Sequence, residues 1–351
     1  MHDYYGNKFK KMMILPIIVG IILLFLVVIY PGIQPGVDLT GGNILIVRSQ
    51  APITESTLTA VLKENFSLQG LRISTIASPT GYGAWIQYDK DPLVTNVENV
   101  ISKASDSIDN EKDSIAFSNE ALTLLGKPTQ EFTNAKTALL VAQQALADNK
   151  EVFSKKLQEV LVQKLNLGNN VEFQQRDISP TLGAASFSSS IFIALLGVVM
   201  IIIIIFIAFR QLIPSAAIIQ AMLFDVLAGL AGMTVLGIPL SLTTLPALLM
   251  LIGYSVDTDI MLTSRMLKGK DGTPGERASA SVKTGLTMTG TTLAALISMI
   301  IVSYFYQIEV IYQISAILFF GLLGDILSTW LMNAPILLWW IEKMEKEHKK
   351  F

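Results

Sequence analysis

Hydrophobic residues are gathered in long blocks along this chain. One apolar block lies near the start, a polar region follows it, and a long apolar stretch begins after about residue 187. About 20 apolar residues in a helix are needed to cross the ~30 Å hydrocarbon core of a bilayer, so each block of that length predicts one membrane span. The chain is therefore expected to have six spans, at about 12–30, 188–209, 215–236, 242–262, 284–303 and 310–340.

The first block, 12–30, has two interpretations. A secretory signal peptide is similarly apolar, but a small-residue cleavage site follows its apolar region. The residues after this block are instead Pro31-Gly32-Ile33-Gln34-Pro35. We therefore interpret the block as a membrane span that is not cleaved.

Lys and Arg between the spans indicate the orientation, because these residues collect in short cytoplasmic segments. With the N-terminal segment inside, every short segment that carries Lys or Arg also falls inside, and the two short outside segments, 236–241 and 304–309, carry neither. The pattern predicts cytoplasmic segments at 1–11 and 341–351 and an extracytoplasmic domain at 31–184. The inside set is Lys8, Lys10, Lys11, Arg210, Arg265, Lys268, Lys270, Arg277, Lys283, Lys343, Lys346, Lys349 and Lys350.

The polar region predicts a small α+β domain. Branched and aromatic residues favour strands, and apolar residues at helical spacing favour helices. Strands are expected at 43–48, 71–77, 85–88 and 171–175, and helices at 54–66 and 92–104. The order βαββαβ is that of a ferredoxin-like sandwich. The expected fold class is thus an α-helical membrane protein with six transmembrane helices, five of them within 185–340, and a ferredoxin-like extracytoplasmic domain.

A further segment, about 105–166, separates the second predicted helix from the last predicted strand. It is rich in Ala, Leu, Glu, Lys and Gln, which favour helices. Lys127-Pro128 interrupts it, and Asp148-Asn149 is a candidate second interruption. We predict a helical insert that protrudes from an otherwise complete domain and can be deleted without unfolding it. The insert is either a solvated spacer or a surface that contacts another chain.

The amino-acid composition excludes several classes of function. Of 351 residues, 51% are hydrophobic and only 15% are charged, below the ~25% usual in soluble domains. The net charge of −2 gives no basis for nucleic-acid binding. Cysteine is absent, which excludes disulfides and thiolate metal sites, and the two histidines, His2 and His348, lie near the termini. We expect no metal, no cofactor and no enzyme activity, since no nucleophile–base pair or phosphate loop is visible.

Four aspartates lie inside predicted spans: Asp225 in the third, Asp257 and Asp259 in the fourth, and Asp325 in the sixth. A charge at the centre of a membrane helix costs about 2.5–3.5 kcal/mol on insertion scales, so such residues are functional candidates. The alternative is that they join helices through hydrogen bonds, and it stays open for Asp225 and Asp325. Asp257 and Asp259 are about 200° apart around their helix, so one can face the bundle interior while the other faces outward.

Other polar residues fall at the same depth. Thr284, Thr287 and Thr291 share one face at the start of the fifth span, and we expect them to support the aspartates. Arg265 lies beyond the fourth span and can reach the cytoplasmic interface. Small residues permit close approach between helices. Two such pairs are Gly229 with Gly232 and Gly321 with Gly324.

The segment after the first span is Gly36-Val37-Asp38-Leu39-Thr40-Gly41-Gly42. It is similar to the G-x-D-x-x-G-G signature of the SecD/SecF family of protein-export membrane proteins. Physically, Gly41 and Gly42 permit a tight turn, and Asp38 can bond backbone amides of that turn. Ile178-Ser179-Pro180-Thr181-Leu182-Gly183, before the second span, also resembles a family motif.

The fourth span carries the stronger resemblance. Ile252-Gly253-Tyr254-Ser255-Val256-Asp257-Thr258-Asp259 is similar to the family pattern I-G-Y-S-x-N-D-T, which is followed by an arginine, here Arg265. Aligned without gaps, Thr258 takes the place of the family's acidic residue, and an aspartate stands on each side. The D-T-D form resembles the archaeal branch. Which of the two carboxylates has the family's role stays open.

The resemblance implies an accessory subunit of the Sec protein translocase in the cell membrane. Its implied partners are a SecD-like subunit, the Sec translocon channel, a translocating polypeptide and membrane lipid. It also implies coupling to the proton gradient, with Asp257, Asp259 and Thr258 as the coupling centre. The alternative is a small-molecule or lipid exporter of the resistance-nodulation-division superfamily, although such exporters usually carry both halves of a twelve-span arrangement.

Overall fold

The protein divides into two compact units. The computed structural model describes Tyr5 and residues 9–78, 81–167, 171–178, 180–269 and 272–348. One unit, called the helical unit below, comprises Met1–Leu39 with Thr181–Phe351, and the other, called the sheet unit, comprises Thr40–Pro180. Each unit is described on its own.

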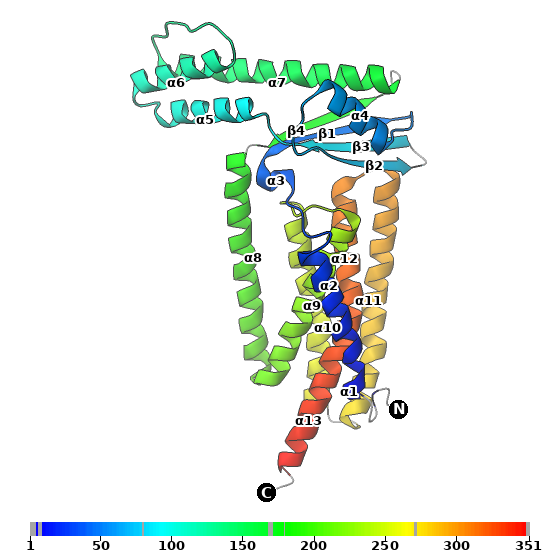
Figure 1. The fold of residues 1–351 in the computed structure, drawn as a ribbon. Helices are drawn as coiled ribbons and strands as arrows, with labels where there is room; N and C mark the ends of the chain where they lie inside the picture. Colours follow the sequence, from blue (N-terminus) through cyan, green and yellow to red (C-terminus); the bar gives the residue numbers. More distant parts are fainter. Residues whose placement is uncertain are drawn as a thin grey trace. The chain divides into compact units, whose positions relative to one another are not determined.

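Six helices among the described residues are long and apolar enough to cross a membrane, which confirms the six predicted spans. They carry the labels of Figure 1. In chain order they are α1 (Phe9–Met12) continued by α2 (Ile14–Val28), α8 (Pro180–Phe209), α9 (Leu212–Leu236), α10 (Thr244–Lys268), α11 (Pro274–Phe305), and α12 (Glu309–Ser328) continued through the π-helical turn η2 (Thr329–Asn333) into α13 (Ala334–His348).

The described part of the segment between the fourth and fifth predicted spans is largely helical. Helix α10 runs on to Lys268, and α11 already begins at Pro274. A capping box starts α11, because the Thr273 hydroxyl accepts from the Glu276 amide and the Glu276 carboxylate accepts from the Thr273 amide. The fifth helix therefore begins about three turns before its apolar part.

Three spans form the centre of the helical unit. Within the most apolar window of each span, 61% of α9, 50% of α10 and 50% of the span built from α12 and α13 is buried, against 6% of α2, 6% of α8 and 17% of α11. Glycines allow the central helices to touch, as predicted. A methyl group at Gly321 would lie 2.2 Å from Leu251 Cδ2, and one at Gly324 would lie 2.5 Å from Ala228 Cβ. The centre is therefore packed at backbone distance.

The segment after the first span is tied to the connection between α9 and α10. The Gly36 amide donates to the Leu240 carbonyl at 2.7 Å, and the Leu240 amide donates to the Gln34 carbonyl at 2.8 Å. A side chain at Gly36 would crowd the Leu240 carbonyl. Gly41 has φ 75°, a left-handed conformation that glycine adopts without strain. This agrees with the tight turn predicted from the Gly36–Gly42 motif.

The described residues of the sheet unit form one antiparallel sheet and four helices (Figure 1). The strand order is β2-β3-β1-β4, and every neighbouring pair is antiparallel. This order is compatible with the predicted ferredoxin-like sandwich. The elements in chain order are β1 (Gly42–Ser49), α4 (Glu55–Asn65), β2 (Arg72–Ser78), β3 (Gly81–Tyr88), α5 (Pro92–Asp106), α6 (Glu111–Leu124), α7 (Ala135–Leu165) and β4 (Glu172–Ile178).

The sheet unit has two hydrophobic cores, and α7 contributes to both. In the sheet core, α4 and the second half of α7 pack against β1 and β3, and Leu157 and Leu161 are fully buried there. In the bundle core, α5, α6 and the first half of α7 pack on one another through residues such as Val97, Leu122 and Leu146. Helix α7 runs unbroken through Asp148-Asn149, so the candidate interruption there is wrong.

Two predictions about this unit therefore need correction. The helix predicted to complete the sandwich, 92–104, belongs to α5 and lies in the bundle core. The segment predicted to be dispensable, 105–166, is helical as expected, but its end supplies Leu157 and Leu161 to the sheet core. The physical reason is that α7 is one continuous helix long enough to serve both cores.

Candidate functional site

Three aspartates meet where the central helices of the helical unit touch. Asp225 comes from α9, Asp259 from α10 and Asp325 from α12, and each is fully buried. Carboxylate oxygens of the three lie within 4.8 Å of one another. Three carboxylates this close, away from water, cannot all be ionised without a large electrostatic cost. The cluster is therefore suited to holding at least one proton.

Hydroxyl groups hold Asp225 in place. The Ser255 hydroxyl, from the next central helix, donates to Asp225 Oδ2. The Ser328 hydroxyl, at the end of α12, donates to Asp225 Oδ1 at 2.6 Å. Because these donors come from two other helices, the carboxylate joins α9, α10 and α12 at one point.

A single hydroxyl lies between the other two carboxylates. Thr329 Oγ1 is 2.9 Å from Asp259 Oδ1 and 2.9 Å from Asp325 Oδ1. A threonine hydroxyl carries one proton, so it can donate to one of these oxygens at a time. If the other carboxyl is protonated, its own O–H can donate to Thr329. Thr329 is thus placed to pass a change of protonation between α10 and α12.

The π-helical turn η2 directs two side chains at Asp259. Its first residue, Thr329, and its last, Asn333, both bond the same oxygen, with Asn333 Nδ2 donating to Asp259 Oδ1 at 2.7 Å. Such turns are rare and are often found at functional sites. The sixth span therefore departs from α-helical geometry at the point where it meets the aspartates.

Several buried polar atoms around Asp259 have no hydrogen-bond partner among the described residues. They are Asp259 Oδ2, Thr263 Oγ1, Trp330 Nε1 and Asn333 Oδ1. Asp259 thus has one satisfied and one unsatisfied oxygen. An unsatisfied buried oxygen is costly as a charge and less so when protonated, so this oxygen is a natural place for a proton.

The fourth span turns one of its two predicted aspartates inward and the other outward. Asp259 lies in the cluster, whereas Asp257 is on the exposed face of α10 together with Gly253 and Tyr254. Thr258 is buried between them. Residues two positions apart along an α-helix are separated by about 200° around its axis, so the two aspartates point in nearly opposite directions. Asp259 is therefore the carboxylate that meets Asp225 and Asp325.

The predicted threonine face of the fifth span does not reach the aspartates. Thr287 and Thr291 are exposed and donate to carbonyls of their own helix, at 2.8 Å in each case. Thr284 accepts a hydrogen bond from Arg265 Nη1 at 2.9 Å. The threonine that faces the cluster is Thr289, whose Oγ1 is 3.5 Å from Asp325 Oδ2. The face of the fifth helix that meets the aspartates is therefore not the predicted one, because the spacing of threonines does not reveal which side of a helix packs against its neighbours.

Two further site residues of the sixth span, Thr329 and Asn333, were not predicted. Together with the predicted Asp325 they follow one another at intervals of four in an otherwise apolar segment. That spacing places them on one helix face. A polar stripe in a membrane span was a usable signal, and it indicates the face that carries the site.

Comparison with known proteins decides the family. Residues 158–343 match the family model of the protein-export membrane proteins SecD/SecF, C-terminal region. This match covers more than half of the chain. The chain belongs to the SecD/SecF family. The matched segment includes all three clustered aspartates and η2.

Archaeal members of the SecD/SecF family resemble this chain in sequence. The protein-export membrane protein SecF of Methanothermobacter thermautotrophicus is 49% identical over 140 residues, which are 39% of this chain and 49% of that protein. SecF of Methanolacinia petrolearia is 44% identical over 163 residues, which are 46% of this chain and 57% of that protein. The chain spans about half the length of the curated relatives that it matches.

Solved structures of the family share the fold. The crystal structure of SecDF from Thermus thermophilus, described as a translocon-associated membrane protein, has a TM-score of 0.57 at 12% identity, and the match covers 96% of this chain and 59% of that one. SecDF in its super-membrane-facing form has a TM-score of 0.51 at 15% identity, over 99% of this chain and 40% of that one. At these identities the likeness concerns the fold, and it agrees with the predicted fold class.

Proposed function

We propose that this chain is an accessory subunit of the Sec protein translocase. It acts with a SecD-like partner and the Sec translocon channel to promote export of polypeptides across the cell membrane. Its N- and C-terminal segments lie in the cytoplasm, and the sheet unit lies on the other side. The observation that carries the proposal is the buried cluster of Asp225, Asp259 and Asp325 in a chain of the SecD/SecF family.

The cluster couples export to the proton gradient in this proposal. When all three carboxylates are close to one another, gain of one proton relieves their repulsion and lets Thr329 bridge Asp259 and Asp325. Loss of the proton breaks that bridge and loosens α10 from α12. A charge that crosses ~100 mV releases about 2.3 kcal/mol, which is comparable to such a change in hydrogen bonding.

Asp259 is the primary carboxylate in this proposal. It is the acidic residue of the fourth-span motif that faces the other two, and its Oδ2 has no partner among the described residues. Asp257 faces outward, toward lipid or a partner subunit. Asp225 and Asp325 share the bound proton with Asp259 and join α9, α10 and α12 through their hydrogen bonds.

The decisive experiment compares the two aspartates of α10. Asparagine keeps the shape and hydrogen bonding of aspartate but cannot ionise. Asp259→Asn should abolish the stimulation of export that depends on the gradient, and Asp257→Asn, two residues away on the exposed face, should retain it. Export is measured in membrane vesicles with the gradient intact and with it collapsed by an ionophore. Pull-down of the SecD-like subunit checks that each variant still assembles.

Full gradient-dependent export by Asp259→Asn would remove proton coupling at this cluster from the proposal.

Thr329→Val separates coupling from packing, because valine keeps the shape and loses the bridging hydroxyl. We expect it to reduce the gradient-dependent part of export and to leave the remainder.

The orientation in the membrane is tested with single cysteines in place of Ser107 and Lys268, since the native chain has no cysteine. A membrane-impermeant thiol reagent should reach them from opposite sides.

A further inference from the structure

The sheet unit contains a pocket between its two cores. The pocket has a volume of about 240 Å³. Its walls come from β1, the α4–β2 connection, the end of β3, the start of α5, the middle of α7, and β4. Both cores of the sheet unit end at this place, so the pocket is part of the junction that α7 passes through.

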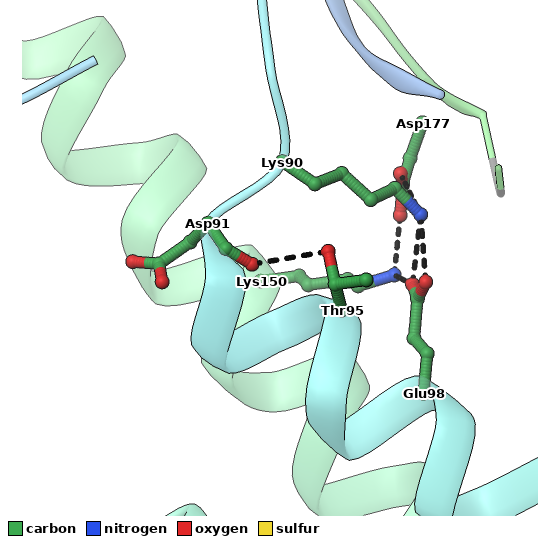
Figure 2. Close-up of polar contacts among 6 residues, drawn as sticks. All are labelled: Lys90, Asp91, Thr95, Glu98, Lys150 and Asp177. Carbon is green, nitrogen blue, oxygen red and sulfur yellow. Dashed lines mark hydrogen bonds and ion pairs between the residues drawn. The ribbon is translucent and has the colours of Figure 1, made fainter. Parts of the chain in front are cut away.

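Three charged residues of the pocket lining, Lys90, Lys150 and Asp177, form ion pairs with one another and with Glu98, which does not line the pocket. Lys90 Nζ donates to Glu98 Oε1 at 2.8 Å and to Asp177 Oδ1 at 2.9 Å, and Lys150 Nζ donates to Glu98 Oε1 at 2.6 Å and to Asp177 Oδ2 (Figure 2). The Lys90 side chain is only 4% exposed. Each lysine therefore bridges both acids, and these four side chains together are neutral. Asp89 and Asp91 also line the pocket.

The ion pairs shift the pKa values of Asp177 and Lys150. Burial alone would raise the pKa of Asp177, but hydrogen bonds from Lys150 and Lys90 hold it below its ordinary value. Burial alone would lower the pKa of Lys150, but hydrogen bonds to Asp177 and Glu98 raise it. A charged ligand placed against these four side chains would have to break their pairs, so this part of the pocket disfavours ligands of either sign.

Another part of the pocket lining is aromatic. The rings of Phe66 and Phe153 meet edge to face with centroids 5.7 Å apart, and the Tyr88 ring lies 6.4 Å from Phe153. Leu68 and Val94 extend this apolar surface. Phe153 is 37% exposed, which is unusual for an aromatic ring with such neighbours. Aromatic rings prefer such edge and offset contacts with other rings.

The hydroxyl of Tyr88 is the unsatisfied polar group of this site. The side chain is 2% exposed, and its hydroxyl has no hydrogen-bond partner among the described residues. Burial, and then the charge of Asp177, raise the pKa of Tyr88 to about 12, so the hydroxyl keeps its proton and can donate it. A buried donor without a partner is costly, and a ligand acceptor would remove that cost.

We propose that this pocket binds an uncharged aromatic ring that carries a hydrogen-bond acceptor. The ring packs against Phe66 and Phe153, and the Tyr88 hydroxyl donates a hydrogen bond to the acceptor. An apolar cavity of about 150 Å³ holds benzene, so a volume of about 240 Å³ accommodates one ring with a polar substituent. The same chemistry occurs in a free small molecule and in an aromatic side chain with its neighbouring amide. The site does not depend on the proposed role in export.

The test uses the full chain in lipid nanodiscs without any partner subunit. The probe is N-acetylphenylalaninamide, observed by saturation-transfer difference NMR and corrected with protein-free nanodiscs. We expect saturable binding and no saturable binding of N-acetyl-lysinamide. N-acetylcyclohexylalaninamide has the same acceptor without an aromatic ring and should bind more weakly. Equal binding of the cyclohexyl probe would overturn the aromatic assignment.

Variants locate the binding. Val94→Trp should fill the pocket and abolish binding, whereas Leu140→Trp adds the same ring at a position that is 64% exposed in the first half of α7 and should leave binding unchanged. Tyr88→Phe keeps the ring and removes the donor, and should weaken binding about fivefold. Binding that is absent in the native chain, or unchanged in both Val94→Trp and Tyr88→Phe, would overturn the proposal.

A competition experiment identifies the source of the ring. A twelve-residue Gly/Ser peptide with one central phenylalanine is compared with the same peptide carrying serine there. Displacement of N-acetylphenylalaninamide by the phenylalanine peptide alone assigns the site to rings borne on polypeptides. Retention of the probe against both peptides, with binding still sensitive to Val94→Trp, assigns it to free small molecules.

Discussion

Leu157→Ala tests whether the end of α7 belongs to the sheet core. The Leu157 side chain is fully buried, with an exposed fraction of 0%. It packs with residues of β1, β3 and α4. Truncation of a fully buried leucine to alanine costs about 2.7–5.0 kcal/mol, because apolar contact is lost and a cavity remains. The sheet should therefore open about 100-fold to several thousand-fold more often, at 1.36 kcal/mol for each factor of ten.

Hydrogen exchange measures this opening in the intact chain. The most protected amides of β1 and β3 should exchange faster by that factor in Leu157→Ala, or exchange completely if the unit unfolds. Leu140→Ala is the matched control, since it makes the same change on the same helix at a side chain that is 64% exposed. A surface change of this kind is expected to stay within ±0.5 kcal/mol. Equal exchange of β1 and β3 in the two variants would refute the assignment of α7 to the sheet core.

Three further predictions follow from the described contacts. Replacing 105–166 by a Gly/Ser joint should unfold the sheet, whereas replacing 92–148 should remove the bundle and keep the sheet, as measured by exchange in β1. Gly321→Ala should lower the thermal stability by about 1–3 kcal/mol through a clash with a central helix, whereas Gly253→Ala, which meets nothing within 4 Å, should be neutral or slightly stabilising. The pKa of Asp177 is lowered in the folded chain, so the stabilisation by its charged form is complete above its ordinary value of 3.8 and is lost as the pH falls from there through the folded pKa. Thermal midpoints over about pH 2–5 should show this loss, and substitution of a lysine partner should reduce it.

The membrane spans could be predicted from the sequence because their signal is local. An apolar block such as that containing Ile201–Ile205 leaves no alternative to a buried or membrane helix. The start of α11 could not be found this way, since 274–283 is polar and is helical through its capping box and its packing. The existence of a span is thus a property of composition, and its length depends on contacts.

The distribution of α7 between two cores could not be predicted. Its sequence has leucine and alanine along its whole length, which favours a helix but gives no reason to prefer one neighbour over another. Only the tertiary structure shows that Leu139 and Leu146 face α5 and α6 while Leu157 and Leu161 face the sheet. The sequence therefore predicted an insert in a complete domain, whereas the structure has one helix, α7, that is shared by two cores.

The aspartate cluster was predictable in part. Intramembrane charge singled out Asp225, Asp257, Asp259 and Asp325 as candidates. Helical geometry required Asp257 and Asp259 to face different ways, but it left open which of them faces the bundle interior. The donors Ser255, Thr289 and Ser328 could not be distinguished from other hydroxyl residues of the spans, because serine and threonine can bond carbonyls of their own helix and carry no insertion cost that marks them. Their role depends on which helices are neighbours.

The continuity of α7 has a mechanical consequence. A helix of 31 residues is about 46 Å long, and about half of that length lies on either side of Lys150. It behaves as a rigid arm whose one end is fixed in the sheet core and whose other end carries α5 and α6. A tilt of about 10° at the junction would move the far end of the bundle by about 4 Å. A small change at the pocket and its four charges is therefore geometrically amplified at the tip of the bundle.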